Sequence, residues 1–320
     1  MADPMGDIDI LVSEVGPRDG LQSIATIMPL DAKKAWIDAE AAAGVREIEV
    51  GSFVPAKLLP QLADTAELVA HARTIPGLTV AVLVPNAKGA EAAIRAGAHK
   101  ITLPLSVSET HSFANLRRSH EQVIDEAIAI AKLIRALPAA DRPHFEGSLS
   151  TAFGCTLEGP IPDAQIARLA ATLMDAGCDE VGLSDTTGYA DPRAVKHLIR
   201  LVRSVVGDDA LTGIHLHNTR GLGLANALAA LECGLTTLDA SLGGLGGCPF
   251  APGASGNIVT EDLVFMLEAM GLRTGIDIDR LLSVREIVTA ALPDEEIYGF
   301  LPDAKLPLGF KPAHSLETVG

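Results

Sequence analysis

Two histidines separated by one residue form the clearest metal-ligand pattern in the sequence. His215 and His217 flank Leu216 in a short apolar run, and the period of two in a β-strand puts both imidazoles on one face. That spacing suits two ligands of one metal ion, although chance or a pair of hydrogen-bonded surface histidines would give the same pattern. Asp19 and Asn257 fall at the expected ends of other strands, which a barrel would place around the same mouth.

These four side chains offer oxygen and nitrogen ligands and no thiolate. A carboxylate, two imidazoles and an amide carbonyl favour Mg²⁺ or Mn²⁺ and disfavour Zn²⁺ without excluding it. We therefore predict a divalent cation held by Asp19, His215, His217 and Asn257.

Arg18 and Cys248 are the candidates for handling charge and protons. Arg18 precedes Asp19 in a Gly- and Pro-containing turn, where it is either half of a structural salt bridge or a fixed cation aimed at developing negative charge. Cys248 follows a stretch with four glycines among five residues, which predicts a backbone that can move or approach a ligand closely. A buried apolar role is the alternative for Cys248, and its place in the loop favours proton transfer.

Further polar side chains are expected at other strand ends, where barrel chemistry takes place. They are Glu49, Ser148, Ser150, Asp185 and Glu261.

Short β-branched runs alternate with Ala-rich segments that carry apolar residues at helical spacing. Eight runs are predicted as strands, at residues 8–15, 47–50, 79–84, 100–103, 144–150, 180–183, 213–217 and 237–241. Asp191 before Pro192, and Thr260, are candidate N-caps, and several helical segments end at glycine, as at Gly44.

Eight strand–helix units predict a (β/α)8 TIM barrel. A doubly wound sheet is the alternative, but it would have a Gly-rich turn after the first strand, where this chain has the charged Gly16–Gly20. We assign residues 1–275 to the barrel and 276–320 to a helical, Pro-rich extension that packs on it or forms a subunit contact.

The composition fits a large globular core. Of the 320 residues, 48% are hydrophobic and only 3% aromatic, so Ala, Val, Ile and Leu are expected to fill a layered interior. The net charge of −16 argues against binding to nucleic acid or to an anionic membrane. Four scattered cysteines, with no targeting or membrane-spanning segment, predict free thiols in a cytoplasmic protein, and a homo-oligomer, plausibly a dimer, is expected.

At the residues described above, the chain resembles the 3-hydroxy-3-methylglutaryl-CoA lyase family of metal-dependent barrel lyases. The matching motifs are EVGPRDGLQ at 14–22, His215-Leu216-His217, and the segment that begins GGLGGCPFAPGASGN at Gly243. The resemblance extends over residues 14–271, and the last segment is its most specific part.

The resemblance implies a role for each predicted site residue. Asp19, His215, His217 and Asn257 are implied as metal ligands, Arg18 as the group that stabilises an enolate, and Cys248 as the proton-handling residue. Glu49, Asp185 and Glu261 are implied as active-site carboxylates that support the ligands or relay protons. An acyl-CoA is the implied substrate, and we assign Arg18, Gln22, Ser148 and Ser150 to its binding.

The implied reaction is a retro-Claisen cleavage that yields acetyl-CoA and a keto acid. A family tyrosine on the fifth strand is replaced by Ser148, which keeps another 3-hydroxyacyl-CoA, such as citramalyl-CoA, open as substrate. A condensing synthase related to isopropylmalate synthase is an alternative of another class, as is a non-catalytic metal- or CoA-binding protein. The Cys248 glycine loop argues against the synthase, and the combination of Arg18, Glu49 and Cys248 argues against the binding protein.

Overall fold

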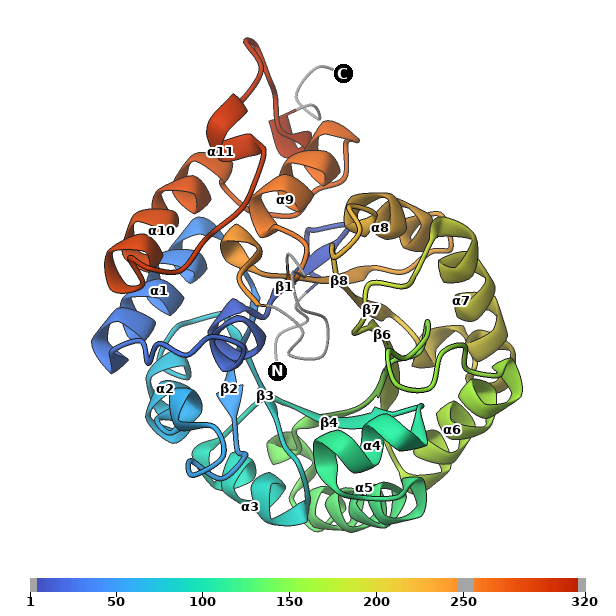
Figure 1. The fold of residues 1–320 in the computed structure, drawn as a ribbon. Helices are drawn as coiled ribbons and strands as arrows, with labels where there is room; N and C mark the ends of the chain where they lie inside the picture. Colours follow the sequence, from blue (N-terminus) through green and yellow to red (C-terminus); the bar gives the residue numbers. More distant parts are fainter. Residues whose placement is uncertain (1–4, 247–255, 316–320) are drawn as a thin grey trace.

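Eight parallel strands close into a barrel in the computed structural model, which describes residues 5–246 and 256–315. Each strand pairs with the next along the chain, and β8 closes the barrel against β1 (Figure 1). The strands are β1 (Leu11–Glu14), β2 (Glu47–Ser52), β3 (Thr79–Leu83), β4 (Lys100–Ser106), β5 (His144–Ser150), β6 (Glu180–Asp185), β7 (Gly213–Leu216) and β8 (Thr237–Ala240). The predicted (β/α)8 barrel is confirmed, and all eight predicted strands are found, with ends that differ by up to three residues.

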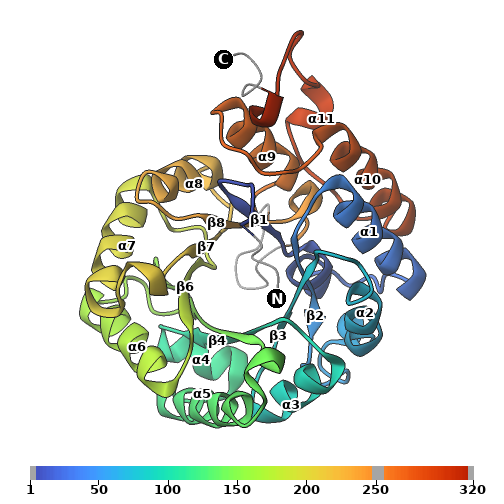
Figure 2. The same cartoon turned by 180° about the vertical axis from the view of Figure 1, so that it is seen from behind.

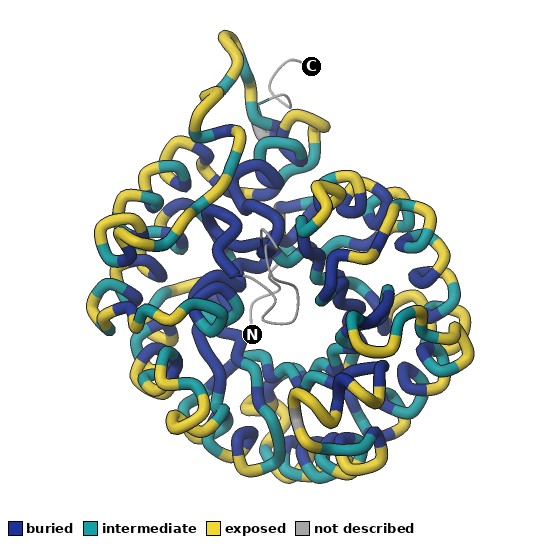
Figure 3. Tube along the Cα trace, in the orientation of Figure 1, coloured by how far each residue is buried: buried dark blue, intermediate teal, exposed yellow. Residues whose placement is uncertain are grey.

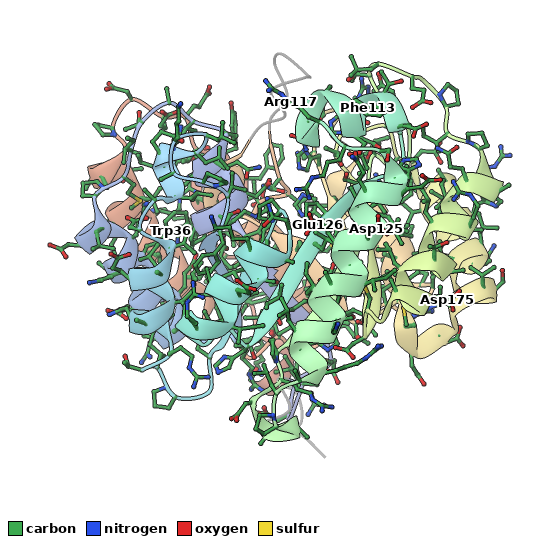
Figure 4. All side chains as sticks on the ribbon, turned by 90° about the horizontal axis from the view of Figure 1, so that it is seen from below. Trp36, Phe113, Arg117, Asp125, Glu126 and Asp175 are labelled. Atoms are coloured by element: carbon green, nitrogen blue, oxygen red, sulfur yellow. The ribbon has the colours of Figure 1, made fainter. Side chains whose placement is uncertain are left out.

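Helices surround the barrel and cover its outer face (Figure 2). They are α1 (Leu30–Ala43), α2 (Thr65–Ala72), α3 (Ala87–Ala96), α4 (Glu109–Leu116), α5 (His120–Arg135), α6 (Asp163–Ala176), α7 (Pro192–Val206), α8 (Gly223–Leu231), α9 (Thr260–Ala269), α10 (Ile278–Ala291) and α11 (Leu301–Ala304). The alternation of strands and helices in the sequence does not predict α4, which is an extra helix over the mouth between β4 and α5. Figure 4 shows Phe113 of α4 and Arg117, the residue that follows this helix, at the upper rim, with Asp175 of α6 lower on the wall.

The helix ends follow their local sequence. Asp191 caps α7 as predicted, because its carboxylate accepts the N–H groups of Arg193 and Ala194. Gly44 ends α1 with φ of 106°, a left-handed conformation that favours glycine. Thr260 was predicted as an N-cap, and that prediction is wrong: Thr260 is the first residue of α9, and its hydroxyl donates to Glu14 instead.

Helix α9 follows β8 and completes the ring of barrel helices between α8 and α1, whereas α10 and α11 lie outside that ring. Figure 1 shows α9, α10 and α11 grouped beside β1, with α10 lying along α1. Burial is densest along the strands and the inner helix faces, whereas the outer faces are exposed (Figure 3). Among the described residues, no helix has the length and apolar character needed to cross a membrane.

A charged cluster fills one layer of the barrel interior. Nζ of Lys100 on β4 lies 2.9 Å from Glu146 on β5, 3.1 Å from Glu180 on β6 and 3.6 Å from Glu47 on β2. Since neither β2 nor β6 is a neighbour of β4, these contacts cross the interior. The expectation of an interior filled by apolar side chains is therefore wrong for this layer, and the apolar core lies between strands and helices.

We predict that Lys100→Met lowers the free energy of unfolding by about 3–5 kcal/mol, because it leaves three carboxylates inside the barrel without their cation. Urea unfolding followed by circular dichroism measures the loss. The exposed Lys57→Met is the control and should change stability by less than about 0.5 kcal/mol. Equal stability of the two variants would contradict the prediction.

Apart from the Lys100 cluster, helix α1 buries the carboxyl group of Glu40. Its two oxygens have no hydrogen-bond partner among the described residues. Burial raises the pKa of Glu40 well above its usual 4.5, and the nearby Glu14 raises it further. Trp36, on the same helix, is fully buried (Figure 4). A carboxyl group in this setting is stable as the neutral acid.

The raised pKa of Glu40 predicts a pH dependence of stability. Its contribution is fully present below the unfolded pKa, near 4.5, and is lost as pH rises through the raised folded pKa. Glu40→Gln cannot ionise, so its unfolding free energy should fall less than that of the wild type between pH 5 and pH 9. Denaturant titrations across this range test the difference, with the exposed Glu91→Gln as control. Parallel stability curves for Glu40→Gln and the wild type would refute the assignment.

Candidate active site and metal centre

The predicted metal ligands come from three places at the carboxyl ends of the strands. His215 lies on β7 and His217 directly follows that strand, so that the two residues share a face. Asp19 lies in a single helical turn after β1, η1 (Gly16–Gly20). Asn257 joins them through a β-bridge to His217. Strand β8 pairs with both β1 and β7, so closure of the barrel brings η1, the turn after β1, close to the end of β7.

The side chains converge within a few ångströms. The two Nε2 atoms of His215 and His217 lie 3.0 Å apart, and Oδ2 of Asp19 lies 4.0 and 3.8 Å from them. The amide of Asn257 donates to the same Oδ2 at 2.8 Å. One ligand atom from each of Asp19, His215 and His217 lies within 4.8 Å of the others. The structure brings the aspartate, the two histidines and the asparagine together, and their role as metal ligands stays a prediction.

Several features of this cluster fit a bound cation. The amide oxygen of Asn257 is buried and has no hydrogen-bond partner in the described part of the chain, which is costly for a polar group. Two imidazole nitrogens that face each other at 3.0 Å are attracted only through a shared proton or a shared cation. The oxygen and nitrogen atoms present match the ligands of a divalent ion.

The protonation states of Asp19 and His217 suit metal ligation, whereas at His215 burial is outweighed by Asp239 and Asp19, which raise the pKa of that imidazole. Burial opposes ionisation of Asp19, but Arg18 and the two imidazoles outweigh it and lower the Asp19 pKa. Burial, together with the charge of His215, lowers the pKa of His217 to about 4, so its imidazole is neutral at pH 7. A deprotonated carboxylate and a neutral imidazole are the forms that bind metals.

Arg18 links the ligand cluster to a second carboxylate. Its Nη1 donates to Asp19 and its Nε to Glu49, each at 2.5 Å. Burial raises the pKa of Glu49 to about 7, although the charge of Arg18 opposes this shift. The guanidinium is thus held between two acidic groups, with donors left over for a ligand.

Of the residues assigned to substrate binding, Gln22 joins the cluster, because its amide lies 3.3 Å from Oδ1 of Asp19. Ser148 and Ser150 occupy alternate positions on β5, so both point to the same face of the strand. Ser148 contacts the hydroxyl of Ser184 at 3.1 Å, and Ser150 contacts that of Ser106 at 3.0 Å. Hydroxyl groups therefore line this side of the mouth.

Asp185 and Glu261 both stabilise loops. Asp185 accepts the N–H groups of Tyr189 and Ala190, which shapes the turn after β6, and burial raises its pKa to about 6. Glu261 contacts none of the metal ligands in the described structure; its carboxylate accepts the N–H of Gly243 and pairs with Arg285. The predicted site residue Cys248 lies outside the described residues.

Sequence reasoning missed Asp239 on β8. Its Oδ2 lies 3.1 Å from Nδ1 of His215, on the side of the imidazole opposite the ligand cluster. Asp239 also lines a cavity of about 20 Å³, room for about one water, between the metal centre and Lys100. Polar residues at alternate positions, Thr237, Asp239 and Ser241, were the signal that could have revealed an interior-facing carboxylate.

We predict that Asp239→Asn weakens Mn²⁺ binding by 10- to 100-fold, because a carboxylate partner orients the imidazole and strengthens its basicity. Electron paramagnetic resonance of free Mn²⁺ measures the dissociation constant directly. The exposed Asp209→Asn is the matched control and should bind Mn²⁺ like the wild type. An unchanged dissociation constant in Asp239→Asn would remove Asp239 from the metal centre.

Comparisons with known proteins show what the chain resembles in sequence and in fold. The HMGL-like family model matches residues 9–288. The mitochondrial hydroxymethylglutaryl-CoA lyase of Macaca fascicularis is 40% identical over 283 residues, which cover 88% of this chain and 86% of that protein. The human enzyme is 39% identical over the same length, with the same coverage. A solved HMG-CoA lyase from Acinetobacter baumannii, in complex with coenzyme A and 3-methylmalate, superposes with a TM-score of 0.87 at 40% identity, covering 95% of this chain and 97% of that one.

Proposed function

The chain belongs to the HMGL-like family and is a carbon–carbon lyase, and from that premise we propose that it cleaves 3-hydroxy-3-methylglutaryl-CoA to acetyl-CoA and acetoacetate with the help of a divalent metal ion. The observation that carries the proposal is the convergence of Asp19, His215, His217 and Asn257 beside Arg18.

The reaction breaks the bond between C2 and C3 of the acyl chain. The 3-hydroxyl loses its proton, C3 becomes the ketone of acetoacetate, and the electron pair passes to C2 as the enolate of acetyl-CoA, which then takes up a proton. A bound divalent cation supplies Lewis acidity that makes the hydroxyl proton easier to remove. Asp19, His215, His217 and Asn257 would hold that cation, and their oxygen and nitrogen atoms favour Mg²⁺ or Mn²⁺ over Zn²⁺.

Arg18 is suited to offset the negative charge of the enolate. Glu49 and Asp19 hold two sides of its guanidinium, so it needs little rearrangement as charge develops. Glu49, with a pKa of about 7, is suited to exchange a proton near neutral pH. Cys248 remains the proposed donor of the final proton to C2.

Two further properties belong to the proposal. Cys155, Cys178 and Cys233 are free thiols, which supports a reducing compartment such as the cytoplasm. We also propose a homo-oligomer with the residues after 275 at the contact, because exposed apolar side chains such as Phe300 and Leu308 lie in that segment.

A related substrate is the second candidate. Ser148 is a small side chain on β5, and the Acinetobacter baumannii structure holds 3-methylmalate, a hydroxydicarboxylate. Lyase activity on a shorter hydroxydicarboxylic thioester, such as citramalyl-CoA, would use the same groups in the same way.

The substrate test incubates the purified protein with Mg²⁺ and each thioester and measures the keto acid released. We expect acetoacetate from 3-hydroxy-3-methylglutaryl-CoA; pyruvate from citramalyl-CoA, without acetoacetate, would favour the second candidate. Condensation of acetyl-CoA with a keto acid, without cleavage of either thioester, would overturn the lyase proposal.

The Arg18→Gln variant tests the role of the guanidinium. Loss of one preorganised charge at the reacting centre should lower kcat by about 100- to 1,000-fold. The exposed Arg193→Gln is the control and should leave kcat unchanged. A fall in substrate affinity at constant kcat would restrict Arg18 to binding.

A further inference from the structure

A carboxylate beneath the metal centre ties together two backbone turns. Glu14, the last residue of β1, is fully buried. Its Oε1 accepts the N–H of Gly16 at 2.8 Å and that of Leu242 at 3.0 Å. Its Oε2 accepts the hydroxyl of Thr260 at 2.7 Å. Glu14 therefore joins η1, which carries Asp19, to the turn η5 (Leu242–Gly244) after β8 and to the start of α9.

The C-terminal segment holds the same turn from the other side. The N–H of Gly243 donates to Glu261 at 2.9 Å, and its carbonyl accepts the N–H of Tyr298 at 2.6 Å. A Cβ at Gly243 would lie 2.7 Å from Cβ of Ile297, so the segment packs directly on this glycine. Both polar groups of the Gly243 backbone are thus fixed by side-chain or backbone partners.

Arg285 of α10 connects these partners to one another. Its Nη1 lies 2.5 Å from Oε1 of Glu261 and 2.9 Å from the carbonyl of Tyr298. The Glu261 side chain is fully buried, whereas that of Arg285 is 17% exposed. Glu14 and Glu40 lie within electrostatic range of Glu261, so this region holds three buried carboxyl groups and the guanidinium of Arg285.

The pinned turn leads directly to a metal ligand. The carbonyl of Leu245, the residue after η5, accepts the amide of Asn257 at 3.3 Å. The same amide donates to Asp19 at 2.8 Å. Gly20 packs against Leu245, because a Cβ added at Gly20 would lie 3.1 Å from the carbonyl oxygen of Leu245. Movement of the 242–245 backbone would therefore displace Asn257 relative to Asp19.

We propose that Arg285, on a helix outside the barrel, is a positioning residue of the metal centre that acts through Glu261 and the 242–245 turn on Asn257. Arg285 pairs with Glu261 and aims its carboxylate at Gly243, and the fixed turn keeps the Asn257 amide in place. The metal part of this inference rests on the proposed function, whereas the ordering of the turn does not.

The test is Arg285→Met in the full-length protein, with two readouts. The dissociation constant for Mn²⁺, measured by electron paramagnetic resonance, should rise 10- to 100-fold, as for loss of other groups that orient metal ligands. Hydrogen–deuterium exchange of the peptide that contains 242–245 should become faster, while exchange of the β7 peptide, 213–216, stays the same. Arg280→Gln is the matched control, because Arg280 lies on the same helix but contacts Asp277 and Ala42, and it should change neither readout.

A double variant separates positioning from a general loss of stability. Glu261→Gln with Arg285→Met keeps an amide oxygen for the Gly243 N–H and leaves no charge unpaired, so it should recover most of the lost Mn²⁺ affinity. If Arg285→Met does not fold, Arg285→Lys provides the same comparison, with a smaller rise in the dissociation constant expected.

The outcomes distinguish the two proposals. Wild-type protein that binds no Mn²⁺ would refute the metal centre, and the exchange of 242–245 would still report on Arg285. Unchanged Mn²⁺ affinity and unchanged exchange in a folded Arg285 variant, beside a wild type that binds Mn²⁺, would refute the positioning role.

Discussion

The charge of Asp19 is the interaction around which the mouth of the barrel is organised. Arg18, two imidazoles and the Asn257 amide surround one carboxylate in a region with little access to water. A desolvated carboxylate is stable only where partners replace its hydration. These partners come from β1, β7 and the segment that leads into α9, so the barrel must close correctly before Asp19 can be accommodated.

Charge continues below the mouth into the barrel. Asp239 contacts His215 and lines a small cavity that Lys100, Glu146 and Glu180 also line. Apolar packing against the helices supplies the stability of the wall, which leaves the interior available for ionised groups. The candidate metal centre is thus the upper end of a polar interior, and the charges beneath it influence its electrostatics.

Support for the mouth also comes from outside the barrel. Glu14 and Glu261 face the helices and bind the backbone of the two turns beside Asp19 and Asn257. Both are buried carboxylates, although neither contacts the metal ligands directly. The acidic residues of the family motifs therefore form two groups. Asp19 lies in the ligand cluster, whereas Glu14 and Glu261 bind the backbone of the neighbouring turns. Through Glu261 the second group connects α10 to the turn after β8.

The sequence by itself determined the alternation of strands and helices and the pairing of His215 with His217 on one strand face, because both depend on the local periodicity of neighbouring residues. The candidate ligands Asp19 and Asn257, and Arg18 beside them, were predicted from the expected strand ends of a barrel and from the family resemblance. Only the tertiary structure decided that Glu261 binds Gly243 and Arg285, that Asp239 supports His215, and that Lys100 lies within the barrel. These contacts join residues at least 18 positions apart in the chain, and strand register and barrel closure determine which side chains meet. A local pattern shows that a side chain is polar and which face it takes, but the partner on that face is fixed by the packing of distant segments.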